Sequence, residues 1–348
     1  MPKRLAMTGP HTAEIRDYDE PLLQPGKVRV KTELASGKHG TTMAAFRGTA
    51  TKGYRFHSEM RLFTPDEAAP PWVAPGSEPR DTGNAGVGVV VELGEGVTRW
   101  KLGDRVFGWM DVRETNVCDA AGLYELGDIP PDEALCIDPA YVAFHSVRES
   151  NVRYGDSVAV VGLGAIGLVA VRMALGAGAE GVFAIDPLLA RREWCASHGA
   201  TAVFDPTACD AALEVHKLTG GKGVDVAIEV SGSYPGLHTA IRATRLCGTI
   251  CSAGFYQGEA NGIWLGNEWH HNRLSMVVPH GCGTGHPPRD FPRWDERRAY
   301  DVIVGLLRSR QLTLPDLVWP IVSLDEGPRV FSWIDREPSK VIKFAVRF

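Results

Sequence analysis

Three glycines have the spacing of a turn that brings the backbone close to a phosphate. Gly162, Gly164 and Gly167 follow a short apolar run and precede a segment with helical spacing. In such a strand–turn–helix unit the first glycine permits a tight turn and the second lets the backbone approach a pyrophosphate. The third lets helix and strand pack closely. Ala165 and Ile166 begin the helix, and we expect its free N–H groups to bind phosphates. The motif predicts a dinucleotide-binding protein.

An acidic residue about 20 positions further on completes this motif. Asp186 follows the apolar run at residues 181–185, and its carboxylate can accept hydrogen bonds from both hydroxyls of a ribose. The same negative charge would repel a 2′-phosphate, so we expect NAD as the cofactor rather than NADP. Two arginines, Arg191 and Arg192, follow on the next helix, where we interpret them as solvated side chains.

The elements that must position these residues alternate between strand and helix. Apolar runs with helix-like segments between them occur at residues 157–161, 181–185, 224–230 and 248–253. Strands that alternate with helices indicate βαβ units and a parallel sheet. Short alternating runs before residue 145, and a last one at residues 341–348, indicate β-strands instead. The segment beyond Pro279 reads as a glycine- and proline-rich loop, followed by a helix over residues 295–310. The two β-rich ends therefore flank a central α/β insert.

Composition limits the class of protein without choosing its chemistry. At 348 residues, 44% hydrophobic and 23% charged, the chain is neither disordered, collagen-like nor a coiled coil, and two domains are expected. A net charge of −5 predicts no binding to nucleic acid or to an anionic membrane. Its apolar runs are shorter than the ~20 residues that span a bilayer, and no signal peptide is visible. We therefore expect a soluble cytoplasmic protein.

The seven cysteines do not form a recognisable site. None belongs to a C-x-x-C pair, so neither a zinc knuckle nor a redox dithiol is indicated. In a cytosolic protein of this size we expect buried free thiols.

The order of these motifs resembles the medium-chain dehydrogenase/reductase superfamily, the group of zinc alcohol and sorbitol dehydrogenases. The stretches that carry the resemblance are the strand and Gly-Asp-Arg-Val turn at 86–106, Tyr154–Val158, Val224–Gly232 and Gly248–Gly254. The resemblance implies an α/β protein with two domains. A GroES-like β-rich catalytic domain would comprise residues 1–147 and 287–348, and a Rossmann domain with a doubly wound parallel sheet would comprise residues 148–286. It also implies that Ser231 contacts the cofactor.

This sequence departs from that superfamily where zinc would bind. His39 stands in place of the first ligand, a cysteine, and the Gly-His-Glu motif of the second ligand is replaced by Gly83-Asn84-Ala85. A carboxylate survives at the third position as Asp138. Catalytic zinc takes three protein ligands, so these residues supply two at most. A third ligand from His57 or Glu59 stays open, but we expect no catalytic metal.

Metal-free acid/base chemistry is the competing interpretation. Thr41 matches the hydroxyl that relays the proton of the alcohol in the superfamily, and Lys38 and His39 flank the place of the zinc ion. Either side chain could carry the substrate's proton, and Asp138 could orient His39. Surface or structural roles for Lys38 and His39 remain open.

The segment around His57 and Glu59 contains two aromatic residues and an arginine. This mixture suits a polyol or sugar, although a surface loop would have the same composition.

We expect an NAD-dependent dehydrogenase that transfers a hydride between nicotinamide and a secondary alcohol or ketone of a sugar, cyclitol or polyol. Its partners would be this small-molecule substrate and further copies of the chain in a homodimer or homotetramer. Two alternatives remain: a zinc-free enoyl or quinone reductase that uses NADPH, and a catalytically silent NAD-binding protein. The carboxylate of Asp186 argues against the first alternative.

Overall fold

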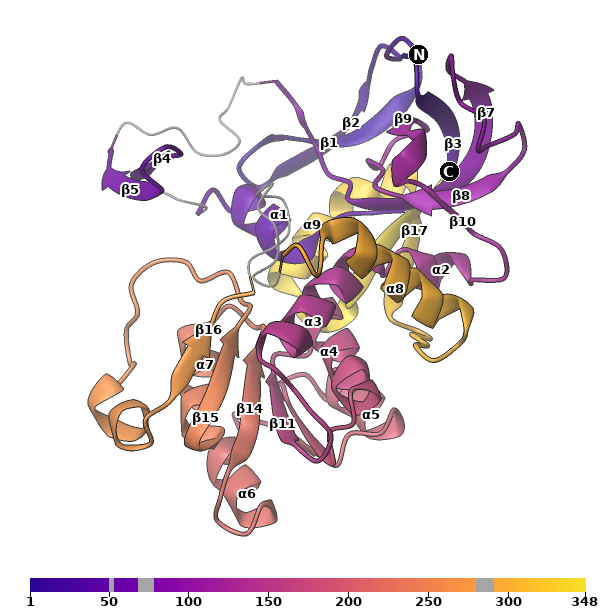
Figure 1. Ribbon diagram of the computed structural model, residues 1–348. Helices are drawn as coiled ribbons and strands as arrows, with labels where there is room; N and C mark the ends of the chain where they lie inside the picture. Colours follow the sequence, from indigo (N-terminus) through magenta and orange to yellow (C-terminus); the bar gives the residue numbers. More distant parts are fainter. Residues whose placement is uncertain (50–52, 68–77, 280–290) are drawn as a thin grey trace. The chain divides into compact units, whose positions relative to one another are not determined.

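The computed structural model describes residues 1–49, 53–67, 78–279 and 291–348. Contacts within the chain divide it into two compact units (Figure 1). Unit 1 comprises Met1–Leu135 and Val318–Phe348, and unit 2 comprises Cys136–Leu317. The functional domain limits expected at 147/148 and 286/287 stay a prediction.

Unit 2 is built on a six-stranded sheet in which every described pair of neighbours is parallel. Its strands are β11 (Ser157–Val161), β12 (Gly181–Ile185), β13 (Ala202–Phe204), β14 (Val224–Glu229), β15 (Thr244–Ser252) and β16 (Ser275–Val277). Its α-helices are α3 (Ile137–Glu149), α4 (Ala165–Gly176), α5 (Leu189–Ser197), α6 (Ala211–Leu218), α7 (Tyr234–Ala243) and α8 (Glu296–Arg308), with a π-helical turn at Leu265–Trp269. The strand order β13-β12-β11-β14-β15-β16 reverses direction between β11 and β14. This is the doubly wound arrangement expected from the sequence.

The central strands of this sheet are apolar on both faces, as a parallel sheet requires when helices cover each side. Ala159 and Val161 of β11 pack with Val215 of α6 and Ile241 of α7 in one core cluster. The alternating residues of β11, Val158 and Val160, point to the other face and are also fully buried. The short apolar runs seen in the sequence therefore form the centre of the sheet.

Unit 1 is rich in antiparallel β-structure. Its main sheet has the order β10-β8-β7-β3-β18-β17, with β9 also paired to β3. These strands are β3 (Lys27–Ser36), β7 (Ala85–Leu93), β8 (Arg105–Gly108), β9 (Thr115–Asp119), β10 (Tyr124–Glu125), β17 (Val318–Ser323) and β18 (Lys343–Arg347). A smaller sheet contains β1 (Lys3–Gly9), β2 (Thr12–Asp17) and β6 (Arg80–Asp81), and β4 (Tyr54–His57) pairs with β5 (Leu62–Pro65) in a hairpin.

Helices complete unit 1. They are α1 (His39–Phe46), α2 (Pro131–Ala134) and α9 (Gly327–Arg336), with short 3₁₀ turns at Ala120–Gly122, Leu324–Glu326 and Pro338–Lys340. Phe46 of α1, Phe331 of α9 and Phe344 of β18 share one core cluster. Strands from both ends of the chain thus build one unit, which agrees with a GroES-like domain assembled from two segments.

The described helices include none that is long and apolar enough to cross a membrane. Among the described cysteines, Cys118, Cys136, Cys195 and Cys251 are buried free thiols, whereas Cys209 and Cys247 are exposed. Cys282 and most of the loop expected beyond Pro279 lie outside the described residues.

Candidate functional site

The glycine turn lies where the strand order of unit 2 reverses, between the carboxyl ends of β11 and β14. Gly162 has a φ of +91°, and a Cβ atom there would lie 2.6 Å from the backbone nitrogen of Ser231, which follows β14. A Cβ atom on Gly167 would lie 1.9 Å from the carbonyl oxygen of Gly162. Both positions therefore require glycine. This reversal point is where open α/β sheets bind their ligands.

Gly164 differs from these two glycines because no described atom lies close to the place where a side chain would begin. A Cβ atom on Gly164 would meet no described atom within 4 Å. Gly164 is also the N-cap of α4, where it offers no side chain to the helix, and the first turn of α4 carries no acidic residue. The N–H groups of that turn, which includes Ala165 and Ile166, can therefore bind an anion. The residues of the turn fit a dinucleotide pyrophosphate.

Asp186 is bound directly to the glycine turn. Its side chain accepts hydrogen bonds from the backbone N–H groups of Leu163 (2.7 Å) and Leu188 (2.8 Å), and the residue is only 4% exposed. Each carboxylate oxygen keeps a second lone pair for a ribose hydroxyl. The guanidinium of Arg191 lies 3.7 Å from this carboxylate, while Arg192 donates to the carbonyl oxygen of Asp186 (2.7 Å). Neither arginine is the fully solvated side chain expected from the sequence.

A buried carboxylate, Glu229, joins the loops that follow β14 and β15. It accepts hydrogen bonds from the backbone N–H (2.7 Å) and the hydroxyl of Ser231 and from the hydroxyl of Tyr256. Burial raises the pKa of Glu229, and these hydrogen bonds offset part of the increase. Burial and the neighbouring Glu229 also raise the pKa of Tyr256. Ser231 is thus held in place beside Gly162. Neither Glu229 nor Tyr256 was expected from the sequence. The signal that could have identified Glu229 is a charged residue at the end of an apolar strand.

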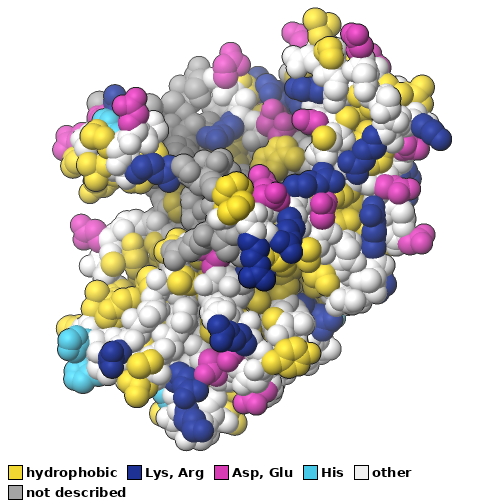
Figure 2. All heavy atoms as spheres, viewed as in Figure 1, with side chains coloured by type: hydrophobic (Ala, Val, Ile, Leu, Met, Phe, Trp, Pro, Cys, Tyr) yellow, Lys and Arg dark blue, Asp and Glu magenta, His cyan; other side chains and the backbone are white. Residues whose placement is uncertain are grey.

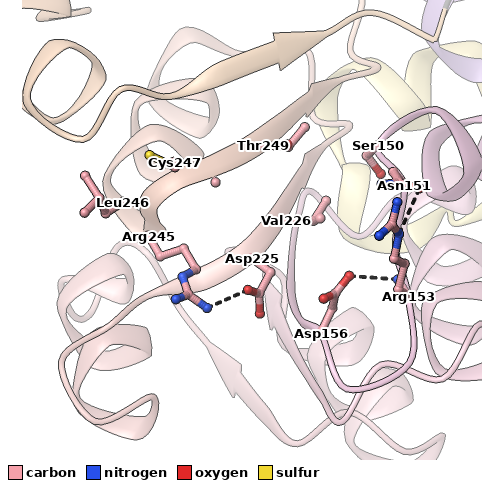
Figure 3. A pocket seen from close by; sticks show the side chains of 11 residues that line it. Ser150, Asn151, Arg153, Asp156, Asp225, Val226, Arg245, Leu246, Cys247 and Thr249 are labelled. Atoms are coloured by element: carbon pink, nitrogen blue, oxygen red, sulfur yellow. Dashed lines mark hydrogen bonds and ion pairs between the residues drawn. The ribbon is translucent and has the colours of Figure 1, made fainter.

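A cavity of unit 2 lies at the opposite, amino-terminal edge of the same sheet (Figure 3). Its volume is about 320 Å³, and residues at the starts of β11, β14 and β15 line it. Its charged side chains are engaged: Asp225 pairs with Arg245 (2.7 Å), and Asp156 accepts a hydrogen bond from the backbone N–H of Arg153 (2.7 Å). Because parallel sheets bind ligands at their carboxyl edge, we do not assign the cofactor to this cavity.

The expected acid/base residues of unit 1 stand at the start of α1. Lys38 is the N-cap of α1, and His39 is its first residue. The ring of His39 stacks on Phe344, and its Nε2 accepts a hydrogen bond from the backbone N–H of Phe344 (3.3 Å). An N–H that points at Nε2 favours the neutral ring with its proton on Nδ1. His39 would therefore present a hydrogen-bond donor.

Thr41 occupies another face of the same helix, since residues two positions apart do not face each other. It lines a small cavity of about 70 Å³ together with Arg80 and Asp81. Asp81 forms an ion pair with Arg4 (3.1 Å). The helix thus places the Thr41 hydroxyl beside charged groups, and away from the ring of His39.

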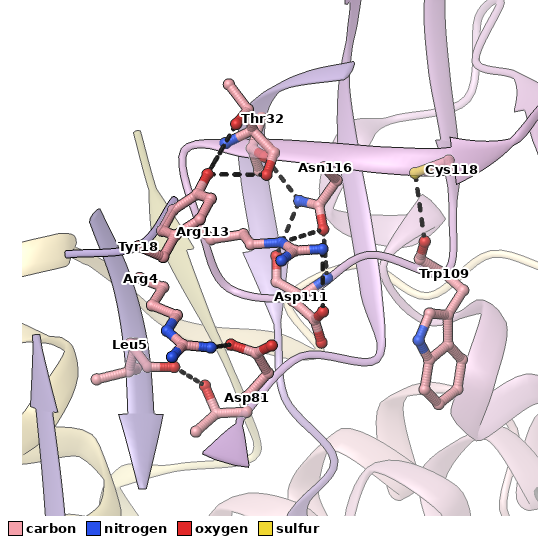
Figure 4. A network of polar contacts seen from close by, with 12 residues as sticks. Arg4, Leu5, Tyr18, Thr32, Asp81, Trp109, Asp111, Arg113, Asn116 and Cys118 are labelled. Atoms are coloured by element: carbon pink, nitrogen blue, oxygen red, sulfur yellow. Dashed lines mark hydrogen bonds and ion pairs between the residues drawn. The ribbon is translucent and has the colours of Figure 1, made fainter. Parts of the chain in front are cut away.

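A network of polar groups continues from Asp81 into the interior of unit 1 (Figure 4). Burial and the neighbouring carboxylate of Asp81 raise the pKa of Asp111 to about 6, while Arg113 and Arg4 oppose the increase. Asn116 fixes this region, because its Oδ1 accepts from the backbone N–H of Asp111 (2.9 Å) and from Nε of Arg113 (3.1 Å).

The structure divides the remaining expected residues between different elements. Asp138, 5% exposed, is the second residue of α3 in unit 2, whereas Lys38, His39 and Thr41 belong to unit 1. His57 lies on the β4–β5 hairpin, where its Nε2 is 2.8 Å from Oγ1 of Thr64.

Glu59 is exposed in the turn of the β4–β5 hairpin. Apolar side chains gather on the same hairpin (Figure 2), including Tyr54 and Phe56, which are 51% and 43% exposed. The segments at 50–52 and 68–77 on either side of it lie outside the described residues.

Asn84 is a further candidate in unit 1; in the sequence it stands out only because it replaces a histidine of the superfamily. It is 2% exposed, and neither atom of its carboxamide has a hydrogen-bond partner among the described residues. A buried polar group without a partner is rare in a folded protein.

Comparisons with known proteins agree with this arrangement. Residues 24–129 match the family "Alcohol dehydrogenase GroES-like domain", and residues 165–294 match "Zinc-binding dehydrogenase". D-guloside 3-dehydrogenase of Escherichia coli (strain K12) is 35% identical over 353 aligned residues, which cover 99% of this chain and 100% of that protein. The chain belongs to the medium-chain dehydrogenase/reductase superfamily. It is therefore an oxidoreductase of this superfamily.

Two solved structures of this superfamily show the same fold. The crystal structure of 2R,3R-butanediol dehydrogenase from Bacillus subtilis has a TM-score of 0.77 at 23% identity and covers 100% of both chains. A protein from Sinorhizobium meliloti 1021, solved with NADP bound, has a TM-score of 0.75 at 23% identity and covers 100% of this chain and 99% of its own. These likenesses confirm the GroES-like and Rossmann architecture predicted from the sequence.

The described residues do not fit the zinc ion that names one of these families. A catalytic zinc needs three protein ligands, and no group of three or more His, Cys, Asp or Glu side chains in the described ranges could hold a metal. His39 already uses Nε2 for the N–H of Phe344, and Asn84 carries a neutral amide. We therefore derive no chemical step through a metal ion.

Proposed function

We propose that this protein is an NAD-dependent dehydrogenase of a secondary alcohol in a sugar, cyclitol or polyol. The observation that carries the proposal is the glycine turn at the reversal point of the sheet, with the carboxylate of Asp186 bound into it. Similarity over the whole chain to a D-guloside 3-dehydrogenase supports a carbohydrate substrate.

Unit 2 supplies the cofactor site. The open side of Gly164 and the N–H groups of Ala165 and Ile166 would receive the pyrophosphate, and Ser231 would contact the cofactor from the end of β14. Asp186 would accept hydrogen bonds from a ribose with a free 2′-hydroxyl, and its charge would disfavour a 2′-phosphate. Arg191 does not reverse this preference, because the carboxylate of Asp186 pairs with its charge at 3.7 Å. The cofactor, when bound, accepts or donates the hydride.

The chain's own side chains would handle the proton. In the oxidising direction the carbinol carbon loses a hydride to NAD⁺ and the hydroxyl loses a proton, which gives a ketone, NADH and H⁺. Lys38 would accept the proton of the hydroxyl, and His39 would donate a hydrogen bond to its oxygen. Thr41 lies on another face of the same helix, so its expected part in relaying the proton stays a prediction. Asp138 belongs to unit 2, and its expected part in this chemistry stays a prediction.

His57 and Glu59, on a hairpin with exposed aromatic rings, would bind the remaining hydroxyls of the substrate. Aromatic faces beside a few polar groups suit a sugar ring.

A binding and turnover experiment tests this proposal. NAD and NADP are titrated separately into the protein, and NADH formation is followed with methyl D-guloside, other methyl glycosides, xylitol, inositol and 2,3-butanediol. We expect tighter binding of NAD than NADP, and Asp186→Ser is expected to remove that preference. Asp205→Ser, at a half-buried aspartate that pairs with Arg192 (3.1 Å), is the matched control. Tighter binding of NADP by the unchanged protein would favour the reductase alternative, and NAD binding without turnover would favour a silent NAD-binding protein.

A further inference from the structure

The carboxamide of Asn84 is the most conspicuous unpartnered group in the described part of unit 1. The residue is 2% exposed, and both Nδ2 and Oδ1 are buried without a hydrogen-bond partner among the described residues. Its backbone N–H donates to the carbonyl oxygen of Ser36 (3.0 Å). The amide therefore has no structural role among the described residues, and a buried group of this kind calls for a partner beyond them.

The polar groups near Asn84 already bind one another. The hydroxyl of Ser36 donates to the carbonyl oxygen of Phe344 (2.6 Å), and the N–H of Phe344 donates to His39 (3.3 Å). On the other side of Asn84 in the chain, the hydroxyl of Thr82 donates to the carbonyl oxygen of Leu5 (2.9 Å). These bonds leave the carboxamide as the group that lacks a partner.

The sheet places Asn84 beside the segment that carries the expected acid/base residues. Ser36, at the end of β3, pairs with Ala85, at the start of β7. Beyond Ser36 the chain passes through Gly37, where a Cβ atom would lie 2.5 Å from the carbonyl oxygen of Thr82. Lys38 and His39 follow immediately. Asn84 and these residues thus flank the same pair of strand ends.

A carboxamide suits an oxygen that changes between hydroxyl and carbonyl. Its Nδ2 donates hydrogen bonds that both forms of the oxygen can accept, and its Oδ1 accepts from a hydroxyl. A polyol presents a second hydroxyl on the adjacent carbon, so both ends of the amide would find partners in one molecule. Such a donor also strengthens its bond as negative charge develops on the oxygen.

We propose that Asn84 binds the reacting secondary alcohol, with Nδ2 donating to the oxygen that becomes the carbonyl and Oδ1 accepting from a neighbouring hydroxyl. The proposal rests on the proposed function and names the group that holds the substrate there. Asn84 would be a catalytic residue that polarises the carbon–oxygen bond without a metal ion.

The variant Asn84→Leu separates this role from a structural one. Leucine has a similar volume and no hydrogen-bonding group, so it removes the buried amide without opening a large cavity. We expect the midpoint of thermal unfolding to stay the same or rise, while kcat/KM for the polyol or methyl glycoside that the unchanged enzyme oxidises falls about 100-fold. The dissociation constant for NAD should not change. Asn84→Ala, which adds no bulk, should show the same fall in kcat/KM.

Asn116→Leu is the matched control for stability. Asn116 is also 2% exposed, but its Nδ2 donates to Thr32 (3.0 Å) and its Oδ1 accepts from Asp111 (2.9 Å). Its replacement should therefore lower the unfolding midpoint clearly. A comparable decrease for Asn84→Leu would show that the amide has a bound partner in the free protein and would overturn the proposal. Unchanged kcat/KM in Asn84→Leu and Asn84→Ala would overturn it as well.

A binding measurement keeps this result distinct from failure of the proposed function. With NADH bound, xylitol and methyl D-guloside are added as probes, and the unfolding midpoint is recorded. A shift in the unchanged protein that is lost in Asn84→Leu supports the proposal, even if no oxidation is detected. Equal shifts in both proteins, or none in either, contradict it.

Discussion

The replacement of Asp111 by asparagine should change the pH dependence of stability in a defined direction. Burial and the carboxylate of Asp81 raise the pKa of Asp111 from 3.8 to about 6 in the folded protein. The folded state therefore holds a proton that the unfolded state has already lost. The contribution of Asp111 to the free energy of unfolding is at its full value below about pH 4. It falls as the pH rises toward 6, because folding then requires a buried charge. Asparagine carries no charge at any pH and escapes this loss.

The size of the effect follows from the difference in pKa. The change from 3.8 to about 6 corresponds to about 3 kcal/mol at 1.36 kcal/mol per pKa unit. The Asp111 side chain is 23% exposed, so solvent screening reduces this to about 2 kcal/mol. The free energy of unfolding of Asp111→Asn, relative to the unchanged protein, should therefore increase by about 2 kcal/mol between pH 4 and pH 7.

Urea unfolding at a series of pH values, followed by circular dichroism, measures this difference. Comparing the two proteins at each pH cancels the pH-independent effect of the substitution on packing. Asp205→Asn provides a control of opposite sign, since hydrogen bonds from Thr207 lower the pKa of Asp205. Asp205→Asn should lower the free energy of unfolding above the pKa of an ordinary aspartate, and this decrease should disappear as the pH falls. A stability difference for Asp111→Asn that is constant from pH 4 to pH 7, or that decreases, would refute the reasoning.

Three further predictions concern the site and its support. Lys38→Ala and His39→Ala should each lower turnover about tenfold or more with NAD affinity preserved, and unchanged turnover in both variants would remove the acid/base assignment. Gly164→Val should fold normally yet lose NAD binding in a fluorescence titration, because the new side chain fills the space for the pyrophosphate. Gly162→Val should fail to fold stably. An NAD affinity of Gly164→Val equal to that of the unchanged protein would contradict the pyrophosphate site. Cys247 has a φ of +58°, so Cys247→Gly should stabilise the protein by about 1 kcal/mol, and a lower unfolding midpoint would show that the backbone is not strained there.

Much of unit 2 could be predicted because its signals are local. The strand at Ser157–Val161 and the helix that follows it were expected within a few residues, since a buried parallel strand is apolar throughout and a glycine turn separates it from the helix. The first helix of unit 2 was harder to predict. The helix Ile137–Glu149 was not anticipated, because its buried side chains include Asp138, His145 and Ser146 and its apolar pattern is weak.

The sequence alone determined the superfamily, the glycine turn and the acidic residue that belongs to it, because these depend on residue type and short spacing. Only the tertiary structure showed that Asp186 binds the turn through Leu163 and that Glu229 joins two loops. It also showed that Asn84 is buried without a hydrogen-bond partner in the described part of the chain. Burial and hydrogen-bond partners depend on residues far apart in the chain, such as Ser36 and Phe344, which no short pattern can bring together. Local spacing therefore predicted a cofactor site, and packing left the buried amide that we propose as a substrate contact.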